Sequence, residues 1–314
     1  MRRDEDAPVL GSFPGTPELN DLVERVLAAW PEHEPFLRQR FAHASAEHFA
    51  FCEAVTSLIA RVTGPGLGTA VTNYRWTCER LLEEERHFAL FDSYRHTTFA
   101  EVEAVVYRDS DFMARYTDGL LLSQVLWSNQ ARALEIYQER FLAGLTGART
   151  LLEVGPGHGL LLALAARREN AGLTGWDVSP GSIEATRSAL SAVGVDSVRL
   201  CCADLLDTPA TEAFDLVVAS ELIEHVDRPD LALRRLGALT SPTGLLFLNI
   251  PVNSPAPDHI TLWRSPEEVF GSIEANGLTI LEQHVFPMTG RTESEARRQR
   301  LTMSCVALCR PGTV

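Results

Sequence analysis

The feature that most constrains the fold is a short apolar strand that runs into a glycine-rich turn and then into a helix. Residues from Leu151 to Val154 are apolar except for Glu153, and the sequence then reads Gly-Pro-Gly-His-Gly before an apolar run that starts at Leu160. Glycines let the backbone approach a ligand where any Cβ would clash. In an open parallel sheet, ligands bind beyond the carboxyl ends of the strands. The segment therefore predicts an α/β fold with a ligand site at this turn.

Short apolar strands alternate with helical segments from residue 149 onward. This alternation predicts βαβ units and a mostly parallel sheet. Runs such as Leu216 to Ala219 are typical of strands that are buried on both faces. Helices are expected from Leu160 and from Ser182, and the last two strands are expected to form a closing pair. The predicted strands cover 150–154, 172–178, 198–203, 214–220, 245–250, 278–285 and 302–308.

The first half of the chain has a different character, because apolar residues recur there at helical spacing. Thr16-Pro17 is a good helix start, with Thr as the cap and Pro at the first helical position. The change near residue 148 predicts two domains, a helical N-terminal domain over 1–147 and an α/β domain over 148–314. Further helices are predicted over 35–62, 70–92, 98–107 and 111–144.

Composition limits the class of protein and its partners. The formal net charge is −14 and the chain contains no lysine, which disfavours nucleic acid and anionic membranes as partners. No stretch approaches the roughly 20 apolar residues that a membrane span needs, and no secretory signal is recognisable at the N-terminus. The six cysteines form no Cys-x-x-Cys pair and are expected to be reduced. A cytoplasmic protein is therefore expected.

Two aspartates follow predicted strands at positions where a nucleoside could be bound. Asp177 ends the second strand, and a carboxylate there can accept hydrogen bonds from both ribose hydroxyls. The competing interpretation is a helix cap, but Ser179 can cap the following helix and leave Asp177 free. Asp204, after the third strand, could read an adenine edge together with the next backbone amide. Alone, it would more often be a turn residue.

These residues resemble the class I S-adenosylmethionine-dependent methyltransferases over roughly residues 149–310. The resemblance rests on the Glu-x-Gly-x-Gly-x-Gly loop at 153–159, on the two aspartates, and on Phe-Asp-Leu-Val at 214–217 leading into Ser-Glu-Leu-Ile-Glu-His-Val at 220–226. The last segment, with Asn249-Ile250-Pro251, is similar to the branch that contains ubiquinone-type O-methyltransferases. The family implies a Rossmann-like, seven-stranded, mostly parallel sheet, here with an N-terminal all-helical cap domain.

The resemblance also implies roles by position. The glycine loop would pass beneath the methionine part of S-adenosylmethionine, Asp177 would bind the ribose, and Asp204 with Leu205 the adenine. Ser220 and Glu221 would lie near the methionine amine and the sulfonium. The expected cofactor-binding residues are Glu153, Gly155, Pro156, Gly157, Gly159, Asp177, Val178, Asp204, Leu205, Ser220, Glu221 and Trp127.

The acceptor side of the cleft offers three candidate catalytic residues. His225 follows the fourth strand and His259 lies in the loop after the fifth, although either could simply anchor a loop. The third is Tyr116, which belongs with Trp127 to an upstream helix that is expected to cover the cleft, because in-line transfer benefits from a closed site. Ordinary helix packing is the competing interpretation for that helix.

Several other chemistries do not match. The Asn/Asp-Pro-Pro-aromatic motif of nucleic-acid amino-methyltransferases is missing after the fourth strand, as is a Pro-Cys nucleophile. The Asp-Asp-Asn metal set of catechol methyltransferases is not recognisable. Glu84-x-x-His87 is half of a di-iron motif, but it has no second copy, so the run 83–86 is interpreted as a solvated helix face. No metal is therefore expected.

Three functions are compatible with these residues. The first is methyl transfer to a small-molecule acceptor of specialised metabolism. The second is intramolecular alkylation of the cofactor, which gives a cyclic amino acid and methylthioadenosine and would need a small, closed pocket of aromatic and polar groups. The third, a non-catalytic cofactor-binding module, is disfavoured by the intact loop. The expected partner is a small-molecule substrate, and a homodimer is left open.

Overall fold

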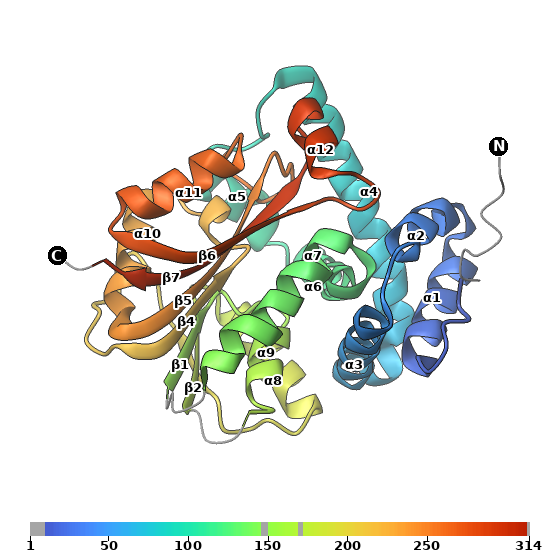
Figure 1. Ribbon diagram of the computed structural model, residues 1–314, viewed down its shortest axis with the longest axis horizontal. Helices are drawn as coiled ribbons and strands as arrows, with labels where there is room; N and C mark the ends of the chain where they lie inside the picture. Colours follow the sequence, from blue (N-terminus) through green and yellow to red (C-terminus); the bar gives the residue numbers. More distant parts are fainter. Residues whose placement is uncertain (1–9, 146–149, 169–171, 313–314) are drawn as a thin grey trace.

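A seven-stranded sheet forms the centre of the molecule in the computed structural model, which describes residues 10–145, 150–168 and 172–312 (Figure 1). The order of the strands is β3-β2-β1-β4-β5-β7-β6. Neighbouring strands from β3 to β5 run parallel, and β7 is antiparallel to both β5 and β6. The strands are β1 (Thr150–Val154), β2 (Gly172–Asp177), β3 (Arg199–Cys202), β4 (Phe214–Ser220), β5 (Thr240–Val252), β6 (Leu278–Pro287) and β7 (Met303–Pro311).

This topology confirms the predicted Rossmann-like sheet, seven strands and mostly parallel, with a closing pair at one edge. The largest difference is in β5, which begins at Thr240 rather than at residue 245. Its early residues pair back to the start of β4, with a register shift between Phe214 and Leu216. The apolar pattern did not indicate this extension, because residues 241–244 are Ser, Pro, Thr and Gly.

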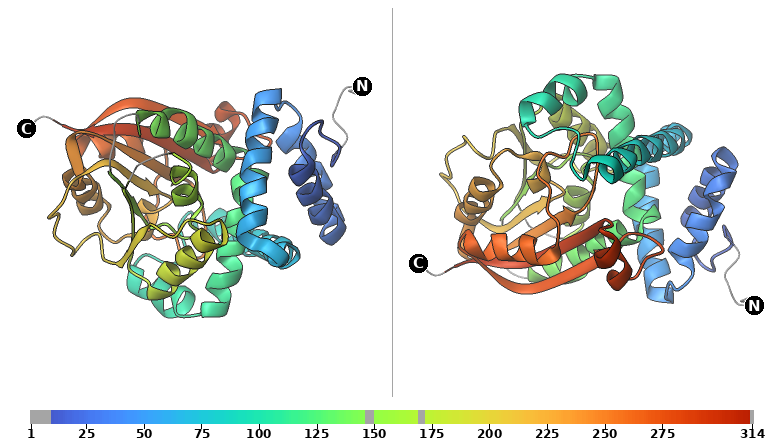
Figure 2. Two further views of the ribbon diagram at one scale, coloured as in Figure 1. Left: turned by 90° about the horizontal axis from the view of Figure 1, so that it is seen from below. Right: turned by 90° about the horizontal axis from the view of Figure 1, so that it is seen from above.

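Different helices cover the two faces of the sheet (Figures 1 and 2). One face packs on α7, η4 and α8, and the other on α10 and α11. Ser179 caps α9 by accepting from the backbone N–H of Ser182, as predicted, so this helix begins two residues earlier than expected. These elements are α8 (Leu160–Ala165), α9 (Pro180–Ala192), η6 (Ile223–His225), α10 (Pro229–Leu239), α11 (Pro266–Ala275) and α12 (Glu293–Gln299).

The described residues of the N-terminal part form helices that turns and short irregular segments connect, without a strand. Its first helices lie at the end of the molecule opposite the C-terminus (Figure 2), and its last ones pack on the sheet. None of the helices in the described ranges is long and apolar enough to cross a membrane. The elements are α1 (Pro17–Ala29), η1 (Pro31–His33), α2 (Glu34–Phe41), α3 (Ala46–Thr63), η2 (Gly64–Gly66), α4 (Leu67–Phe91), α5 (Phe99–Val102), η3 (Glu103–Tyr107), α6 (Ser110–Leu126), α7 (Ser128–Ile136), η4 (Tyr137–Phe141) and η5 (Leu142–Leu145).

Several expectations for this part were wrong in detail. The helix predicted over 35–62 is two helices, because Ser45 caps a new one at Ala46. The helix predicted over 111–144 is interrupted at Trp127, whose backbone is extended. Thr16 occupies the N-cap of α1, but its hydroxyl donates to a backbone carbonyl and does not cap. Glu84 does not belong to a solvated face, since it is buried and pairs with Arg95 at 3.0 Å.

The two predicted domains share one hydrophobic core. A single cluster of buried side chains extends from Phe13 in the N-terminal part to Leu308 in β7. The ring of Phe247 on β5 lies 5.4 Å from that of Tyr137 and 5.5 Å from that of Phe141, centroid to centroid. Because aromatic contacts of this kind dominate core energetics, the helices and the sheet are expected to depend on each other for stability.

Candidate functional site

The glycine turn after β1 is built from backbone conformations that favour glycine. Gly155, Gly157 and Gly159 all have positive φ, between 48° and 73°. A Cβ on Gly155 would lie 2.9 Å from the side chain of Leu222, whereas a Cβ on Gly157 would meet no described atom within 4 Å. The turn is therefore packed on one side and open at Gly157, which fits a ligand that contacts the backbone there.

The side chains of Glu153 and His158 contact the backbone of the helix that follows the turn. Glu153 is fully buried in β1, where its carboxyl accepts the backbone N–H of Leu162, and burial raises its pKa well above the usual range. One of its oxygens has no partner among the described residues. His158 Nδ1 accepts from the N–H of Leu160 at 3.3 Å, and burial lowers the pKa of this histidine to about 4. Both side chains are thus placed to shape the turn.

Asp177 is less free than predicted. Ser179 does cap α9, but its backbone N–H also donates to Asp177 Oδ1 at 2.8 Å, and the hydroxyl of Ser182 donates to Oδ2 at 2.6 Å. A carboxylate offers about four lone-pair sites, so two acceptor sites remain. Val178, the next residue, is 46% exposed beside it. The local structure fixes the carboxylate and still leaves it able to bind a diol.

Asp204 forms a turn, as the competing interpretation of this residue predicted. Its Oδ1 accepts from the backbone N–H of Leu206 at 2.7 Å, and its carbonyl accepts from Thr208 at 2.8 Å. Leu205 is buried against the second face of the sheet. A contact of either residue with adenine stays a prediction.

The end of β4 carries a constrained acidic residue. Glu221 has φ +51°, a conformation that costs non-glycine residues about 1–3 kcal/mol and that clusters at functional sites. Asn249 donates to Glu221 Oε1 at 2.9 Å and to Ser220 Oγ at 3.3 Å. Burial raises the pKa of Glu221 to about 7, although hydrogen bonds from Gln130 and Asn249 lower this pKa. The adjacent helix α7 therefore contributes directly to this end of the sheet.

A small pocket, with room for about one water molecule, lies between the same strands and the neighbouring helices. Its polar lining comes from Gln124, Gln130, Ser220 and Asn249, and its aromatic lining from Tyr137 and Phe247.

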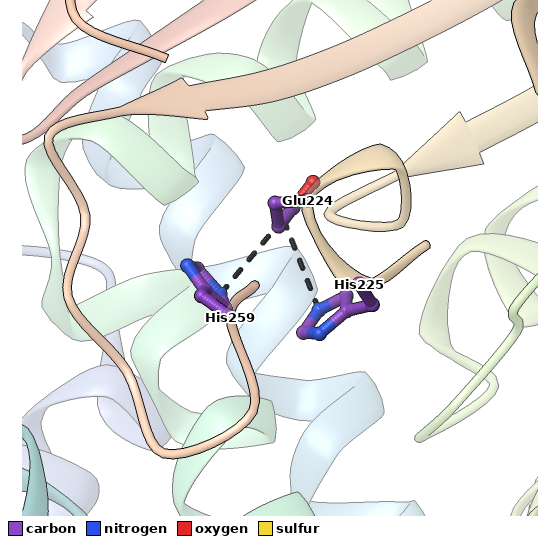
Figure 3. A group of neighbouring side chains, drawn as sticks. All are labelled: Glu224, His225 and His259. Atoms are coloured by element: carbon purple, nitrogen blue, oxygen red, sulfur yellow. Dashed lines mark ion pairs between the residues drawn. The ribbon is translucent and has the colours of Figure 1, made fainter. Parts of the chain in front are cut away.

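Two histidines converge on one carboxylate just beyond β4 (Figure 3). His225 Nε2 lies 3.9 Å and His259 Nε2 4.0 Å from Glu224 Oε1. The two imidazole rings are 4.8 Å apart and nearly perpendicular. Glu224 and His225 come from η6, whereas His259 comes from the loop after β5, so only the tertiary structure brings them together.

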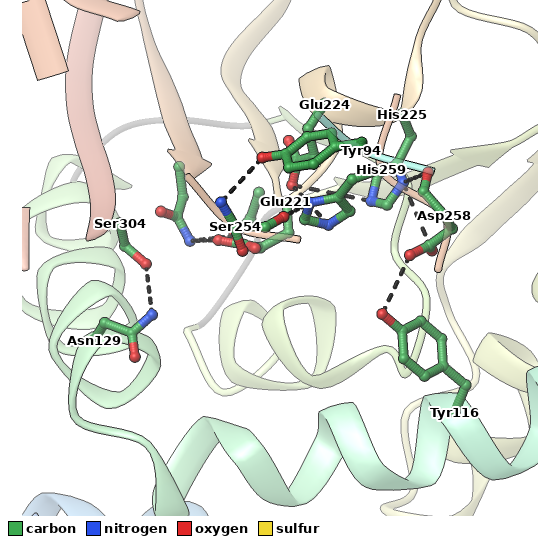
Figure 4. Close-up of polar contacts among 12 residues, drawn as sticks. Tyr94, Tyr116, Asn129, Glu221, Glu224, His225, Ser254, Asp258, His259 and Ser304 are labelled. Atoms are coloured by element: carbon green, nitrogen blue, oxygen red, sulfur yellow. Dashed lines mark hydrogen bonds and ion pairs between the residues drawn. The ribbon is translucent and has the colours of Figure 1, made fainter. Parts of the chain in front are cut away.

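The loop after β5 orients both histidines (Figure 4). His225 Nδ1 lies 2.9 Å from the carbonyl oxygen of Asp258, and His259 Nδ1 lies 2.6 Å from that of Ser254. The backbone N–H of Ser254 in turn donates to the hydroxyl of Tyr94 at 2.9 Å. The pKa of His259 is lowered to about 4, mainly by burial and to a smaller extent by the neighbouring His225. This lowered pKa indicates that the imidazole of His259 is neutral.

The structure separates the two aromatic residues that were predicted to cover the cleft. Tyr116 is buried on α6, and its hydroxyl donates to Asp258 Oδ1 at 3.2 Å. Trp127 instead packs against the helical core and donates its indole N–H to Tyr74 at 2.9 Å. Tyr116 therefore lies at the histidine cluster, whereas the polar tip of Trp127 is already bound within the N-terminal helices.

Sequence reasoning gave no role to several residues of this site. No role was predicted for Glu224, which lies within the motif at 220–226, or for Asp258, Tyr94, Tyr107 and Gln130. The hydroxyl of Tyr107 lies 3.3 Å from His225 Nδ1. The one available signal was the Glu-x-x-Glu-His spacing at 221–225, which places two carboxylates and an imidazole at the end of one strand.

Comparison with known proteins finds matches to the central segment. Residues 152–248 match the family model described as a methyltransferase domain. Among curated proteins, the ubiquinone biosynthesis O-methyltransferase of Azorhizobium caulinodans is 36% identical over 115 residues, which are 36% of this chain and 44% of that protein. The protein of the same name from Xanthomonas oryzae pv. oryzae is 37% identical over 114 residues, 36% of this chain and 46% of that one.

The chain thus spans about half the length of the curated relatives it matches. Among solved structures, mitomycin 7-O-methyltransferase has a similar fold, with a TM-score of 0.50 and 14% identity over 85% of this chain and 76% of that one. That similarity concerns the fold, including part of the N-terminal helices.

Proposed function

We propose that this chain is a class I S-adenosylmethionine-dependent methyltransferase that transfers the methyl group to a hydroxyl oxygen of a small molecule, because residues 152–248 match a methyltransferase domain. The observation that carries the proposal is the juxtaposition of the open glycine turn with the Glu224–His225–His259 cluster at the same end of the sheet. The names of the curated relatives, which are O-methyltransferases, support an oxygen acceptor.

The residues present fit this cofactor, which supplies an electrophilic methyl group when bound. The open space at Gly157 suits its methionine part, and Asp177 keeps two acceptor sites for the ribose hydroxyls. Glu221 and Ser220 would bind the methionine amine, since the hydrogen bond that Asn249 donates to Glu221 keeps the carboxyl group oriented. Asp204 and Leu205 remain our proposed adenine contacts.

The acceptor would bind on the side of His225 and His259. A neutral imidazole can take the proton of an attacking hydroxyl if the two lie within hydrogen-bond reach. His225 is the better candidate, because its side chain is 17% exposed whereas that of His259 is 7% exposed. We also propose that residues 1–147 act as the cap over this site, in a cytoplasmic enzyme of specialised metabolism.

The test is an incubation with S-adenosylmethionine carrying a labelled methyl group and a panel of phenolic, sugar and macrolide hydroxyl acceptors, with products identified by mass spectrometry. We expect S-adenosylhomocysteine together with a labelled methyl ether. The proposal is contradicted if the protein binds S-adenosylmethionine but leaves it intact with every acceptor class.

A second candidate is cyclisation of the cofactor itself. The small pocket beside Ser220 is lined by aromatic and polar groups, the kind of lining that this reaction would need. The same incubation without any acceptor separates the two reactions. Methylthioadenosine would indicate cyclisation, and its absence alongside a methylated acceptor would indicate methyl transfer.

Asp177→Ala is expected to weaken S-adenosylmethionine binding by about 2 kcal/mol, roughly 30-fold, because the ribose loses hydrogen bonds to a charged group. The measurement is titration calorimetry. Ser182→Ala is the control, since it removes the Ser182–Asp177 hydrogen bond and keeps the carboxylate. Equal losses of affinity in both variants would assign the effect to a loosened α9 and not to the ribose.

Tyr116→Phe is expected to lower turnover roughly tenfold, because the loop that carries the histidines loses the hydrogen bond to Asp258 and positioning of the reacting groups is sensitive to small shifts. Trp127→Phe loses a hydrogen bond of the same kind, to Tyr74. It should keep both turnover and cofactor affinity. A Trp127 variant that loses cofactor affinity would restore this residue to the site predicted from the sequence.

A further inference from the structure

The carboxylate of Glu224 is buried without a conventional partner. Its exposed fraction is 0%, and neither oxygen has a hydrogen-bond partner among the described residues. Its position is nonetheless fixed, because the N–H groups of Ile260 and Thr261 both donate to its backbone carbonyl at 2.9 Å. Burying an ionised carboxylate is costly unless a cation compensates its charge. The two nearest nitrogens, on His225 and His259, are too distant for hydrogen bonds.

The two histidines present lone pairs, not protons, to this carboxylate. Each Nδ1 is bound to a backbone carbonyl, of Asp258 for His225 and of Ser254 for His259. Since a carbonyl can only accept, Nδ1 carries the proton and Nε2 the lone pair. Histidines that bind metals have this arrangement, with the other ring N–H donated to a carbonyl or carboxylate.

We propose that Glu224, His225 and His259 bind one divalent first-row transition-metal ion. Their three ligand atoms lie within 4.8 Å of one another. Metal–ligand bonds of about 2.1 Å in a tetrahedral site separate ligand atoms by about 3.4 Å, so the side chains would move together by about half an ångström. Two imidazoles with one carboxylate suit zinc, iron or manganese, whereas calcium and magnesium prefer oxygen ligands.

The surroundings favour a cation and give it access. Asp258 Oδ2 lies 3.6 Å from His225 Nδ1, and the charge of Glu221 acts on Glu224. The partly exposed side chain of His225 gives an ion a route from solvent. No metal was expected from the sequence, which has neither a second Glu-x-x-His copy nor a recognisable Asp-Asp-Asn set. With the ion bound, His225 is a ligand and not the base proposed above, and the cation instead lowers the pKa of the hydroxyl acceptor in the proposed methyl transfer.

The experiment uses the full chain after treatment with a chelator and dialysis. Manganese(II) is titrated in and followed by the loss of the free-ion signal in electron paramagnetic resonance. We expect one bound ion per chain, displaced by zinc(II). Glu224→Gln and His259→Gln should each weaken binding by about tenfold or more. His284→Gln is the control, because His284 pairs with Glu282 on the surface of β6, away from this cluster.

Urea unfolding of the metal-free Glu224→Gln variant tests whether a loss of metal binding is caused by misfolding. This variant should be at least as stable as the parent chain, because it removes an unpartnered buried carboxyl. Wild-type binding that is absent, or equal to that of Glu224→Gln, would overturn the metal site. A chain that binds one manganese ion and transfers no methyl group would contradict the proposed function alone, whereas methyl transfer without metal binding would contradict the metal site alone.

Discussion

Replacing Gly157 with alanine is expected to weaken S-adenosylmethionine binding by about 100-fold and to leave the fold intact. The added Cβ meets no described protein atom within 4 Å, so it would project into the space assigned to the cofactor. Overpacking of this kind costs about 1–3 kcal/mol, and the upper end corresponds to roughly 100-fold in affinity. Titration calorimetry measures the affinity, and thermal unfolding measures the stability.

Gly194→Ala is the matched control for the backbone strain. Gly194 follows α9, has φ +79°, and also has no described atom within 4 Å of an added Cβ. Both variants should therefore lose about 1 kcal/mol of stability, because alanine is disfavoured at positive φ. Only the Gly157 variant should lose affinity. Equal affinity in the two variants would remove the glycine turn from the cofactor site.

Phe247→Ala is expected to lower the free energy of unfolding by about 3–5 kcal/mol, the usual cost of emptying a buried phenylalanine site. Phe247 is 1% exposed on β5, and its ring contacts those of Tyr137 and Phe141 from the helical part. Because these residues belong to one core, the destabilised protein should still unfold in a single transition, followed by circular dichroism and by tryptophan fluorescence in urea.

Phe91→Ala is the corresponding control on the surface. Phe91 ends α4 and is 65% exposed, so its loss should change stability by no more than about 0.5 kcal/mol. Two separate transitions in the Phe247 variant, with only one shifted, would show that 1–147 and 148–314 fold independently, as the change in sequence character near residue 148 suggested.

The architecture of the sheet and the place of the ligand turn follow from the sequence by itself. Strands buried on both faces are continuous apolar runs, and a turn with positive φ at three positions favours glycine at each of them. Both signals are local in the chain, which is why the Gly155–Gly159 turn, the end of β4 and the closing pair were all predicted. The cap role of Ser179 is local in the same way.

The tertiary structure alone decided which side chains meet at the end of the sheet. His259 reaches Glu224 because the loop after β5 folds back onto η6, with two backbone N–H groups donating to the Glu224 carbonyl. Tyr116 reaches Asp258 across 142 residues of sequence, and the break at Trp127 turns its indole N–H toward Tyr74. Such contacts depend on how segments that are distant in the sequence pack together, and local periodicity and spacing do not encode that packing. For this reason the sequence alone could not show that His259 belongs to a buried cluster of a carboxylate and two imidazoles.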